Sequence, residues 1–153
     1  MKALQRLLGP ATFWLSWPVA YIYLRVGSRT RVLVIVDDLV LVVKGRFGLD
    51  SWSLPGGGVH HAEDPVAGAV REVVEETGIQ LNPSQLKFLY TARARTKGLQ
   101  FNYNCYYVLL DERPVVKKRL SEIAETAWVP LKDVSPDNAS STTCTAVEAW
   151  LKH

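Results

Sequence analysis

Cysteine is scarce in this chain, and neither sign of charge dominates. Cys105 and Cys144 are the only thiols in 153 residues; they lie far apart and lack the close spacing of a zinc site. This pattern disfavours a disulfide-stabilised secreted domain and indicates a reducing, intracellular compartment. The 18 basic and 15 acidic residues leave a formal net charge of +3, which is too small to predict nucleic-acid binding by itself.

Internal repeats are also absent, which excludes a solenoid or another repeat array. Hydrophobic residues make up 48% of the chain and charged residues 22%, the balance of an ordinary globular protein with enough apolar side chains for a core. The length is that of one domain. We therefore expect a hydrophobic N-terminal segment over residues 1–26 and one domain over residues 27–153.

The N-terminal segment carries no charged side chain between Arg6 and Arg25. Residues 7–24 are 18 in number, the lower limit for a membrane-spanning helix, and their Trp and Tyr side chains suit the membrane interface. No small-residue cleavage site is obvious. Three interpretations are open: a membrane anchor, either spanning or interfacial; a helix packed on the domain or on a partner subunit; and a removed signal peptide. As an anchor, the segment would attach the domain to the cytoplasmic face of a membrane.

Strands are expected wherever β-branched or alternating apolar residues recur. A polar linker over residues 27–31 leads into two apolar runs, which Asp37 and Asp38 separate as the turn of a buried hairpin. Two longer strands show a period of two, and this period assigns Phe88 and Tyr90 to the same face. The predicted strands cover residues 31–36, 39–44, 85–95, 99–110 and 126–129.

Two helices are expected, and their ends can be read from the sequence. In the first, Asp64 can cap the start, Pro65 suits the first position, and Gly78 suits the position just past the end. The second covers residues 139–152, and its core-facing side chains are expected to be Val147, Trp150 and Leu151. A mixed sheet with these two helices fits an α/β/α sandwich.

The first helix concentrates carboxylates on one face. Glu72, Glu75 and Glu76 stand at positions i, i+3 and i+4, so their side chains project together. Like charges at this spacing destabilise a helix by about 0.2–0.5 kcal/mol per pair. A hard divalent cation such as Mg²⁺ would compensate, because it prefers carboxylate oxygens and bridges to substrate phosphates. A solvated acidic helix face is the simpler alternative.

The residues before this helix complete a longer motif. Residues 52–58 form a Gly-rich loop, which lets the backbone approach a ligand closely. From Gly57 the chain reads five residues, Glu63, seven residues, and then Arg-Glu-Val-Val-Glu-Glu-Thr-Gly-Ile over residues 71–79. This stretch resembles the Nudix box at every fixed position, and the resemblance to the Nudix hydrolase family extends over roughly residues 31–134.

The resemblance implies a fold and an activity. The fold is a Nudix-type α/β/α sandwich with a mixed β-sheet. Residues 1–26 lie outside the resemblance, and we expect an N-terminal hydrophobic helix there in addition. The activity is Mg²⁺-dependent hydrolysis of a pyrophosphate bond in a nucleoside diphosphate linked to another moiety, and Mn²⁺ can replace Mg²⁺. A nucleoside triphosphate, a nucleotide sugar and a lipid-linked diphosphate are all open as the phosphorylated small-molecule substrate.

The resemblance also implies roles for residues of the motif. The expected metal ligands are the carboxylates of Glu72, Glu75 and Glu76 and the carbonyl oxygen of Gly57. The candidate catalytic residues are Glu72 and Arg71. Glu72 is either a further metal ligand or the base that accepts a proton from the attacking water. Arg71 would orient the carboxylates and tie the helix to the loop through Glu63, although a plain structural ion pair is the alternative.

Four charged residues outside these positions are further candidates. Glu122 precedes the closing strand and could serve as an additional ligand or base. Arg46 lies in the loop before the motif, where it could flank a base or sugar. Arg93 and Arg95 lie near the end of a strand, where they could contact a substrate phosphate. For each of the four, the alternative is a solvated or structural surface charge.

Two other function classes fit parts of the sequence. A catalytically weak Nudix module could bind a nucleotide as a sensor, but all the motif carboxylates are present. An RNA 5′-end pyrophosphohydrolase would need a basic groove and aromatic stacking platforms, and the small net charge disfavours nucleic acid as a partner. The sequence leaves the oligomeric state open.

Overall fold

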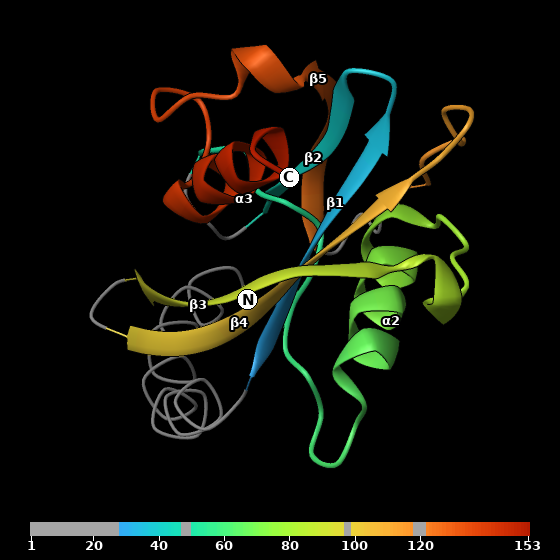
Figure 1. The fold of residues 1–153 in the computed structure, drawn as a ribbon, viewed down its shortest axis with the longest axis vertical. Coiled ribbons are helices and arrows are strands. Elements are labelled where there is room, and N and C mark those ends of the chain that lie inside the picture. The colour runs from blue at the N-terminus through green and yellow to red at the C-terminus, as the bar shows by residue number, and fades with distance from the viewer. Residues whose placement is uncertain (1–27, 47–49, 97–98, 118–121) are drawn as a thin grey trace, which may run out of the picture.

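A five-stranded mixed sheet forms the middle layer of the fold, and one helix covers each of its faces (Figure 1). The computed structural model describes residues 28–46, 50–96, 99–117 and 122–153. The described elements are β1 (Arg29–Val36), β2 (Leu39–Gly45), α2 (Pro65–Thr77), the 3-10 helix η1 (Pro83–Gln85), β3 (Lys87–Thr96), β4 (Leu99–Leu109), β5 (Ile123–Pro130), the 3-10 helix η2 (Leu131–Asp133) and α3 (Ser141–Leu151).

The strand order is β3-β4-β1-β2-β5, and the β1–β4 pair is parallel while the other neighbouring pairs are antiparallel. β1 and β2 form the predicted hairpin, with Asp37 at a φ of 54° in the turn. They pair only next to that turn, where Ile35 faces Val40. The two strands then separate, so one edge of β1 is left without a strand partner over the first half of its length.

The glycine loop occupies this free edge of β1. The Thr30 N–H donates to the Gly57 carbonyl oxygen at 2.8 Å, and the Val32 N–H donates to the Pro55 carbonyl oxygen at 2.9 Å. These bonds fix the loop in line with the sheet, because β1 itself is held by β4 on its other side. The loop is therefore a rigid part of the fold at the place where α2 passes over it.

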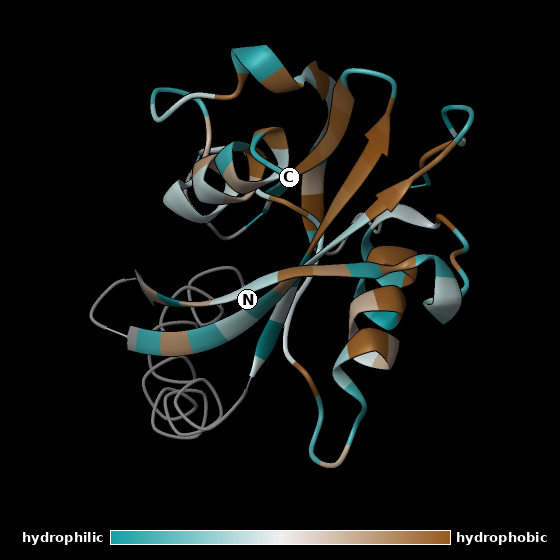
Figure 2. Ribbon diagram, in the orientation of Figure 1, coloured by the Kyte–Doolittle hydropathy of each residue, from teal (hydrophilic) through white to brown (hydrophobic). Residues whose placement is uncertain are grey.

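β1 and β2 are apolar on both faces because each face meets a helix. One core cluster includes Val32, Val34 and Leu41 of the strands with Ala69 and Val73 of α2. The other includes Leu33, Ile35 and Val40 of the strands with Ala146 and Val147 of α3. Figure 2 shows hydrophobic residues concentrated in these central strands. The predicted α/β/α sandwich with a mixed sheet is confirmed.

Helix α2 begins and ends at the predicted residues. The Asp64 carboxylate accepts the N–H groups of Val66 and Ala67, both at 3.0 Å, and Pro65 occupies the first helical position. Gly78 ends the helix at a φ of 72°, and its N–H donates to a carbonyl of the last turn. These two ends fix which residues face the glycine loop and which face the core.

Two strands begin earlier than predicted. β1 begins at Arg29 instead of following a linker over residues 27–31, because its first residues pair in parallel with β4. The Arg29 guanidinium also lies 4.6 Å from the ring centroid of Phe101, a cation–π contact that helps to order the strand. β5 begins at Ile123, three residues earlier than predicted, because it continues to pair with the end of β2.

Two predicted side-chain directions were wrong. The register of β3 shifts between Phe88 and Tyr90, so Phe88 packs against Tyr106 on the α2 side while Tyr90 contacts Tyr103 on the α3 side. Strict alternation put both on one face, and a bulge inserts the residue that breaks the period. In α3, Val147 is buried as predicted, but Leu151 is 63% exposed and does not belong to the core.

The predictions for residues 1–26, including the hydrophobic helix and the membrane contact through residues 7–24, lie outside the described residues. Within the ranges that the structure describes, no helix combines the length and the apolar character that crossing a membrane requires.

Candidate active site

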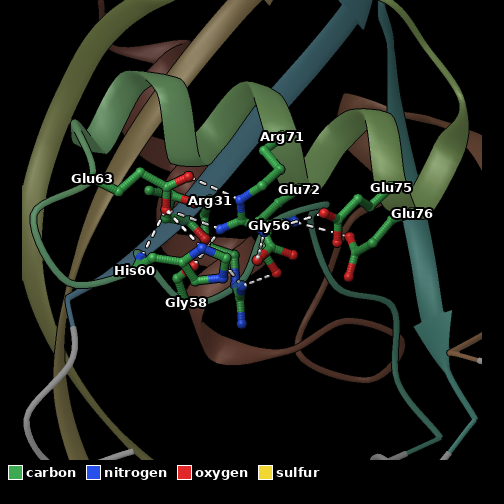
Figure 3. Close-up of polar contacts among 10 residues, drawn as sticks. Arg31, Gly56, Gly58, His60, Glu63, Arg71, Glu72, Glu75 and Glu76 are labelled. Carbon is green, nitrogen blue, oxygen red and sulfur yellow. Dashed lines mark hydrogen bonds and ion pairs between the residues drawn. The ribbon is translucent and has the colours of Figure 1, made fainter. Parts of the chain in front are cut away.

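The carboxylates of Glu72, Glu75 and Glu76, here called the box carboxylates, lie between α2 and the glycine loop (Figure 3). Glu76 lies half-buried against the glycine loop: its Oε2 accepts the Gly56 N–H at 3.0 Å. Burial raises the pKa of the Glu76 carboxyl to about 7, and the Gly56 N–H and the Arg31 charge act only partly against it. A carboxyl group in this state binds a proton or a cation more readily than an exposed glutamate does.

Glu72 is held in one orientation by two neighbours. Its Oε1 accepts from Arg71 Nη1 at 2.9 Å, and its carboxylate packs against the backbone of Gly57. A Cβ added at Gly57 would lie 2.5 Å from the Glu72 carboxylate, closer than two such atoms can approach. Glycine at this position therefore lets Glu72 keep its place, because a Cβ would displace the carboxylate.

Arg71 commits all three of its guanidinium nitrogens to this site. Nε and Nη2 donate to the two carboxylate oxygens of Glu63 at 2.9 and 3.1 Å, and Nη2 also donates to the Gly58 carbonyl at 2.8 Å. Nη1 holds Glu72 and lies 3.6 Å from Glu75 Oε1. The structure thus contains the predicted link from helix to loop through Glu63, and it adds a bond to the loop backbone.

Glu63 is bound strongly enough to stay ionised in acid. The hydrogen bonds from Arg71 and from the His60 N–H, the latter at 2.7 Å, lower the pKa of Glu63 to about 2. The Arg71 pKa is raised by the same pair. Together these bonds fix the loop that precedes α2, so the positions of the other carboxylates depend on them.

Arg31 is a second cation at the site and was not among the predicted site residues. Its Nη1 donates to the Gly56 carbonyl at 2.6 Å and to the Thr30 carbonyl at 3.1 Å. Burial lowers the pKa of Arg31, while the charges of Glu76 and Glu72 act in the opposite direction. Gly56 is therefore held on both sides, by Arg31 through its carbonyl and by Glu76 through its N–H.

A sequence signal for Arg31 exists in retrospect. It is a charged residue in a β-branched strand, and alternation puts it on the same face as the buried Leu33 and Ile35. A charge at such a position needs a specific partner. The partner, Gly56, is 25 residues away in the chain, so no local pattern identifies it.

The other predicted site residues divide into two groups. Glu122 is close enough to Glu76 for its charge to raise the Glu76 pKa. The Glu122 carbonyl accepts the Arg46 N–H at 2.8 Å, so the backbone of Arg46 lies next to Glu122. Arg93 is on β3, the edge strand two places from β1, and its Nε donates to Asn102 Oδ1 at 3.2 Å. Arg95 pairs with Gln100 in the same hairpin. The structure does not bring Arg93 into contact with these carboxylates, and the side chain of Arg95 lies outside what the structure describes.

The oxygen donors that a metal ion could use come from α2 and from the glycine loop. Within the described part of the chain, no group of three or more His, Cys, Asp or Glu side chains is close enough to form a ready-made cation site. The chemistry of the donors nevertheless fits Mg²⁺. The charges of Glu72 and Glu122 raise the Glu76 pKa, a repulsion that a divalent cation would relieve. The Gly57 carbonyl accepts the Thr30 N–H and has a second lone pair.

Comparison with known proteins identifies the family. The model of the NUDIX domain matches residues 26–145, which include the glycine loop, α2 and all five strands. The chain belongs to the NUDIX domain family.

Two curated relatives are similar in sequence. The CMP-5'-(N-acetyl-N-hydroxy-3-aminopropyl)phosphonate hydrolase of Streptomyces rubellomurinus is 30% identical over 122 residues, which cover 75% of this chain and 57% of the relative. Diphosphoinositol polyphosphate phosphohydrolase 2 of Homo sapiens is 46% identical over 44 residues, which cover 29% of this chain and 24% of that protein. The chain thus spans little more than half of the first relative and about a quarter of the second.

Solved structures share the fold. A MutT NUDIX hydrolase from Burkholderia pseudomallei superimposes with a TM-score of 0.71 at 21% identity, covering 80% of this chain and 96% of the other. The NUDIX domain of Shewanella oneidensis NrtR complexed with ADP ribose superimposes with a TM-score of 0.69 at 20% identity, covering 82% and 86%.

Proposed function

We propose that the protein hydrolyses a pyrophosphate bond in a nucleoside diphosphate linked to another moiety, with Mg²⁺ as cofactor. The observation that carries this proposal is the pair of carboxylates beside the glycine loop. Glu72 is oriented by Arg71, and the half-buried Glu76 accepts the Gly56 N–H. Maintaining two acidic groups in such surroundings opposes stability, and function is the usual reason for it.

Some residues of the site would bind the cofactor, and one would accept a proton. Mg²⁺, when bound, would neutralise phosphate charge and lower the pKa of a coordinated water. Its ligands would be the Gly57 carbonyl and the carboxylates of Glu75, Glu76 and, in one of two roles, Glu72. In the other role, Glu72 accepts the proton of the attacking water while Arg71 keeps its carboxylate in place.

The names of the relatives support cleavage at phosphorus. One relative is described as the hydrolase of a CMP-linked phosphonate and another as the phosphohydrolase of a diphosphoinositol polyphosphate. Both compounds carry linked phosphorus groups, as does the nucleoside diphosphate compound that we propose. A nucleoside triphosphate and a nucleotide sugar are the first substrate classes to test.

The test is release of phosphate or pyrophosphate by the full chain with Mg²⁺. The panel contains nucleoside triphosphates, nucleotide sugars, dinucleoside polyphosphates, a CMP-linked phosphonate and prenyl diphosphates, and Glu76→Gln is the blank. We expect turnover of one class, abolished by EDTA and restored by Mg²⁺ or Mn²⁺. No turnover on any compound, with nucleotide binding still detected by thermal shift, would favour the sensor function instead.

A further inference from the structure

A hollow of about 530 Å³ lies where the C-terminal end of α2 meets the segment that follows β4, on the side of the sheet that α2 covers (Figure 1). Its lining combines apolar side chains with two carboxylates, which belong to Ile79, Leu110, Pro114 and Val115 and to Asp111 and Glu112. None of its lining residues belongs to the glycine loop or carries a box carboxylate. The proposed activity therefore leaves this surface without an explanation.

The wall that follows β4 is fixed to the domain. The Leu110 N–H donates to a carbonyl of β1 at 2.9 Å, and the Lys117 N–H donates to the last carbonyl of α2 at 2.7 Å. Between these two bonds, Val116 packs against the core cluster on the α2 side, while its neighbour Val115 is 79% exposed. Because the segment is anchored at both ends, Val115 stays on the surface as part of the hollow.

Further apolar side chains are exposed at the same end of the sheet. Phe88 is 57% exposed and packs against Tyr106 on the α2 side, the side that carries the hollow. β3 begins beside the end of β4, where Lys87 faces Tyr107, and β4 ends two residues later at Leu109, which is 55% exposed. A group of exposed apolar side chains with a polar rim is typical of a protein–protein contact.

The charges of this surface complement one another. Lys87 is exposed next to Phe88, and the exposed Asp111 and Glu112 stand at the hollow, while Arg113 is not among the residues that line it. Neither Lys87 nor the two carboxylates form an ion pair with another residue that the structure describes. One face thus presents a projecting ring and a hollow, and a lysine and two acids. A two-fold symmetric contact between identical chains needs such self-complementarity.

Pairing of strand edges is the less favourable contact here. β3 is an edge strand, but a bulge interrupts it between Phe88 and Tyr90, and Lys87 puts a charge at its start. Bulges and lysines on an edge strand oppose the addition of another strand. The contact that this surface favours is therefore one between side chains.

We infer that this surface binds a second copy of the chain. Phe88 of each copy enters the hollow of the other, and Lys87 of each copy meets Asp111 and Glu112 across the contact. The inference goes beyond the proposed function and uses none of the box carboxylates.

The experiment is sedimentation equilibrium of the full chain over a concentration series, which gives the Kd of self-association. Val115→Asp puts a charge into the hollow, and Phe88→Ser removes the projecting ring. Leu151→Asp is the matched control, because Leu151 is 63% exposed on α3, which covers the other face of the sheet. We expect Kd to rise about tenfold or more in both variants and to stay within about twofold in the control. Circular dichroism checks that each variant is folded.

Exchanging the charges tests the pairing across the contact. Lys87→Glu alone, and Asp111→Lys with Glu112→Lys, should each weaken self-association by about fivefold or more, because like charges then face each other. The chain that carries all three changes should associate more tightly than either of these, since opposite charges face each other again. A merely structural effect of the substitutions would not be rescued in this way.

Three outcomes would overturn the inference. A wild-type chain that stays monomeric over the whole series would leave the hollow to a partner other than a second copy. Self-association that neither Val115→Asp nor Phe88→Ser weakens would show that a different surface joins the copies. A triple charge exchange that associates no more tightly than its parents would remove the pairing of Lys87 with the two acids. No substrate enters the measurement, so each outcome is independent of whether the chain hydrolyses a pyrophosphate bond.

Discussion

Glu76 shows how one residue can be set apart from its neighbours on the same helix face. It stands one turn from Glu72, yet Glu72 is bound by a guanidinium, while the half-buried Glu76 accepts a single backbone N–H. One neutral donor offsets little of the desolvation of a carboxylate, so the Glu76 pKa rises to about 7. Glu76 therefore depends most on a bound cation for its charged form, and it is the residue to change first.

Replacing Glu76 by glutamine should preserve the fold and remove activity. The amide keeps the size of the carboxyl and can still accept the Gly56 N–H, but it binds Mg²⁺ weakly. We expect kcat to fall at least 100-fold, about 2.7 kcal/mol of lost transition-state stabilisation. Steady-state kinetics on the substrate found by the panel measures this, with Glu148→Gln on the exposed face of α3 as the control. Turnover close to wild type would exclude Glu76 as a ligand.

Glu76 should also make the metal-free protein less stable at higher pH. Its folded-state pKa of about 7 lies above the ordinary value of 4.5, so the native chain keeps a proton that the unfolded chain releases. The contribution is fully present below pH 4.5 and is lost as pH rises through 7. Relative to Glu76→Gln, wild type should lose up to about 3 kcal/mol of unfolding free energy between pH 4.5 and 8.

Urea unfolding of both proteins in EDTA at the two pH values gives this difference, since other titrating groups are common to both. If the difference in unfolding free energy between wild type and Glu76→Gln is the same at both pH values, the Glu76 carboxyl is solvated in the metal-free state.

The glycine loop connects β1 to the carboxylates of α2, and its two central glycines have different reasons to be glycine. Gly56 has a φ of 138°, and a Cβ there would meet the Thr30 carbonyl oxygen at 2.3 Å, a rigid backbone atom. At Gly57 the Cβ would meet the end of the Glu72 side chain, which can turn away. The first glycine therefore serves the fold and the second serves the site.

Alanine at these two positions should separate stability from activity. Gly56→Ala should lose about 1–3 kcal/mol of unfolding free energy, because it strains both φ and the β1 contact. Gly57→Ala should unfold within about 1 kcal/mol of wild type, but kcat/KM should fall at least tenfold as Glu72 is displaced. Urea unfolding and steady-state kinetics on both variants provide the comparison. A Gly57→Ala variant with full activity would show that the position of Glu72 is not critical.

The helices and strands could be predicted because their ends depend on neighbouring residues. The wrong predictions concern features that depend on contacts between residues far apart in the chain. Asp64 and Gly78 mark the ends of α2 because a cap depends on the residues within one turn. The bulge beside Phe88 depends on how β3 meets β4, so the strand's own alternation could not reveal it. The exposure of Leu151, which is 63%, likewise depends on tertiary packing, which the apolar pattern of α3 does not specify.

The same division holds for the site. The helical period brought the three box carboxylates to one face, and the resemblance supplied their link to Glu63 through Arg71. Arg31 was missed because its function comes from a strand and a loop that meet only in the folded chain.

The sandwich explains why the site lies where it does in the molecule. The central strands pack against a helix on each face, and β1 pairs in parallel with β4 on one side and antiparallel with β2 on the other. β2 departs from β1 soon after the hairpin, so the glycine loop can enter and place Gly56 and Gly57 under α2. The site residues are thus held in place by the sheet through β1 and by the core through α2.

The N-terminal segment can be separated from this domain by experiment. β1, the first strand that the structure describes, begins at Arg29, after the hydrophobic stretch. We propose that residues 7–24 attach the domain to the cytoplasmic face of a membrane. Deleting residues 1–25 should then leave a chain with cooperative unfolding and unchanged kcat on a soluble substrate. In sedimentation with anionic phospholipid vesicles, the full chain should pellet and the shortened chain should stay in solution.

A shortened chain without a cooperative transition in circular dichroism would contradict the anchor and indicate that residues 1–25 complete the core. The full chain staying in solution with vesicles, while the shortened chain is folded, would indicate a packed helix or a subunit contact instead. The two measurements together therefore distinguish the anchor from the packed helix, because only an anchor predicts a stable domain and a lost membrane contact at once. Turnover then tells whether the membrane presents the substrate: full kcat on soluble compounds would place the whole catalytic apparatus in residues 26–153.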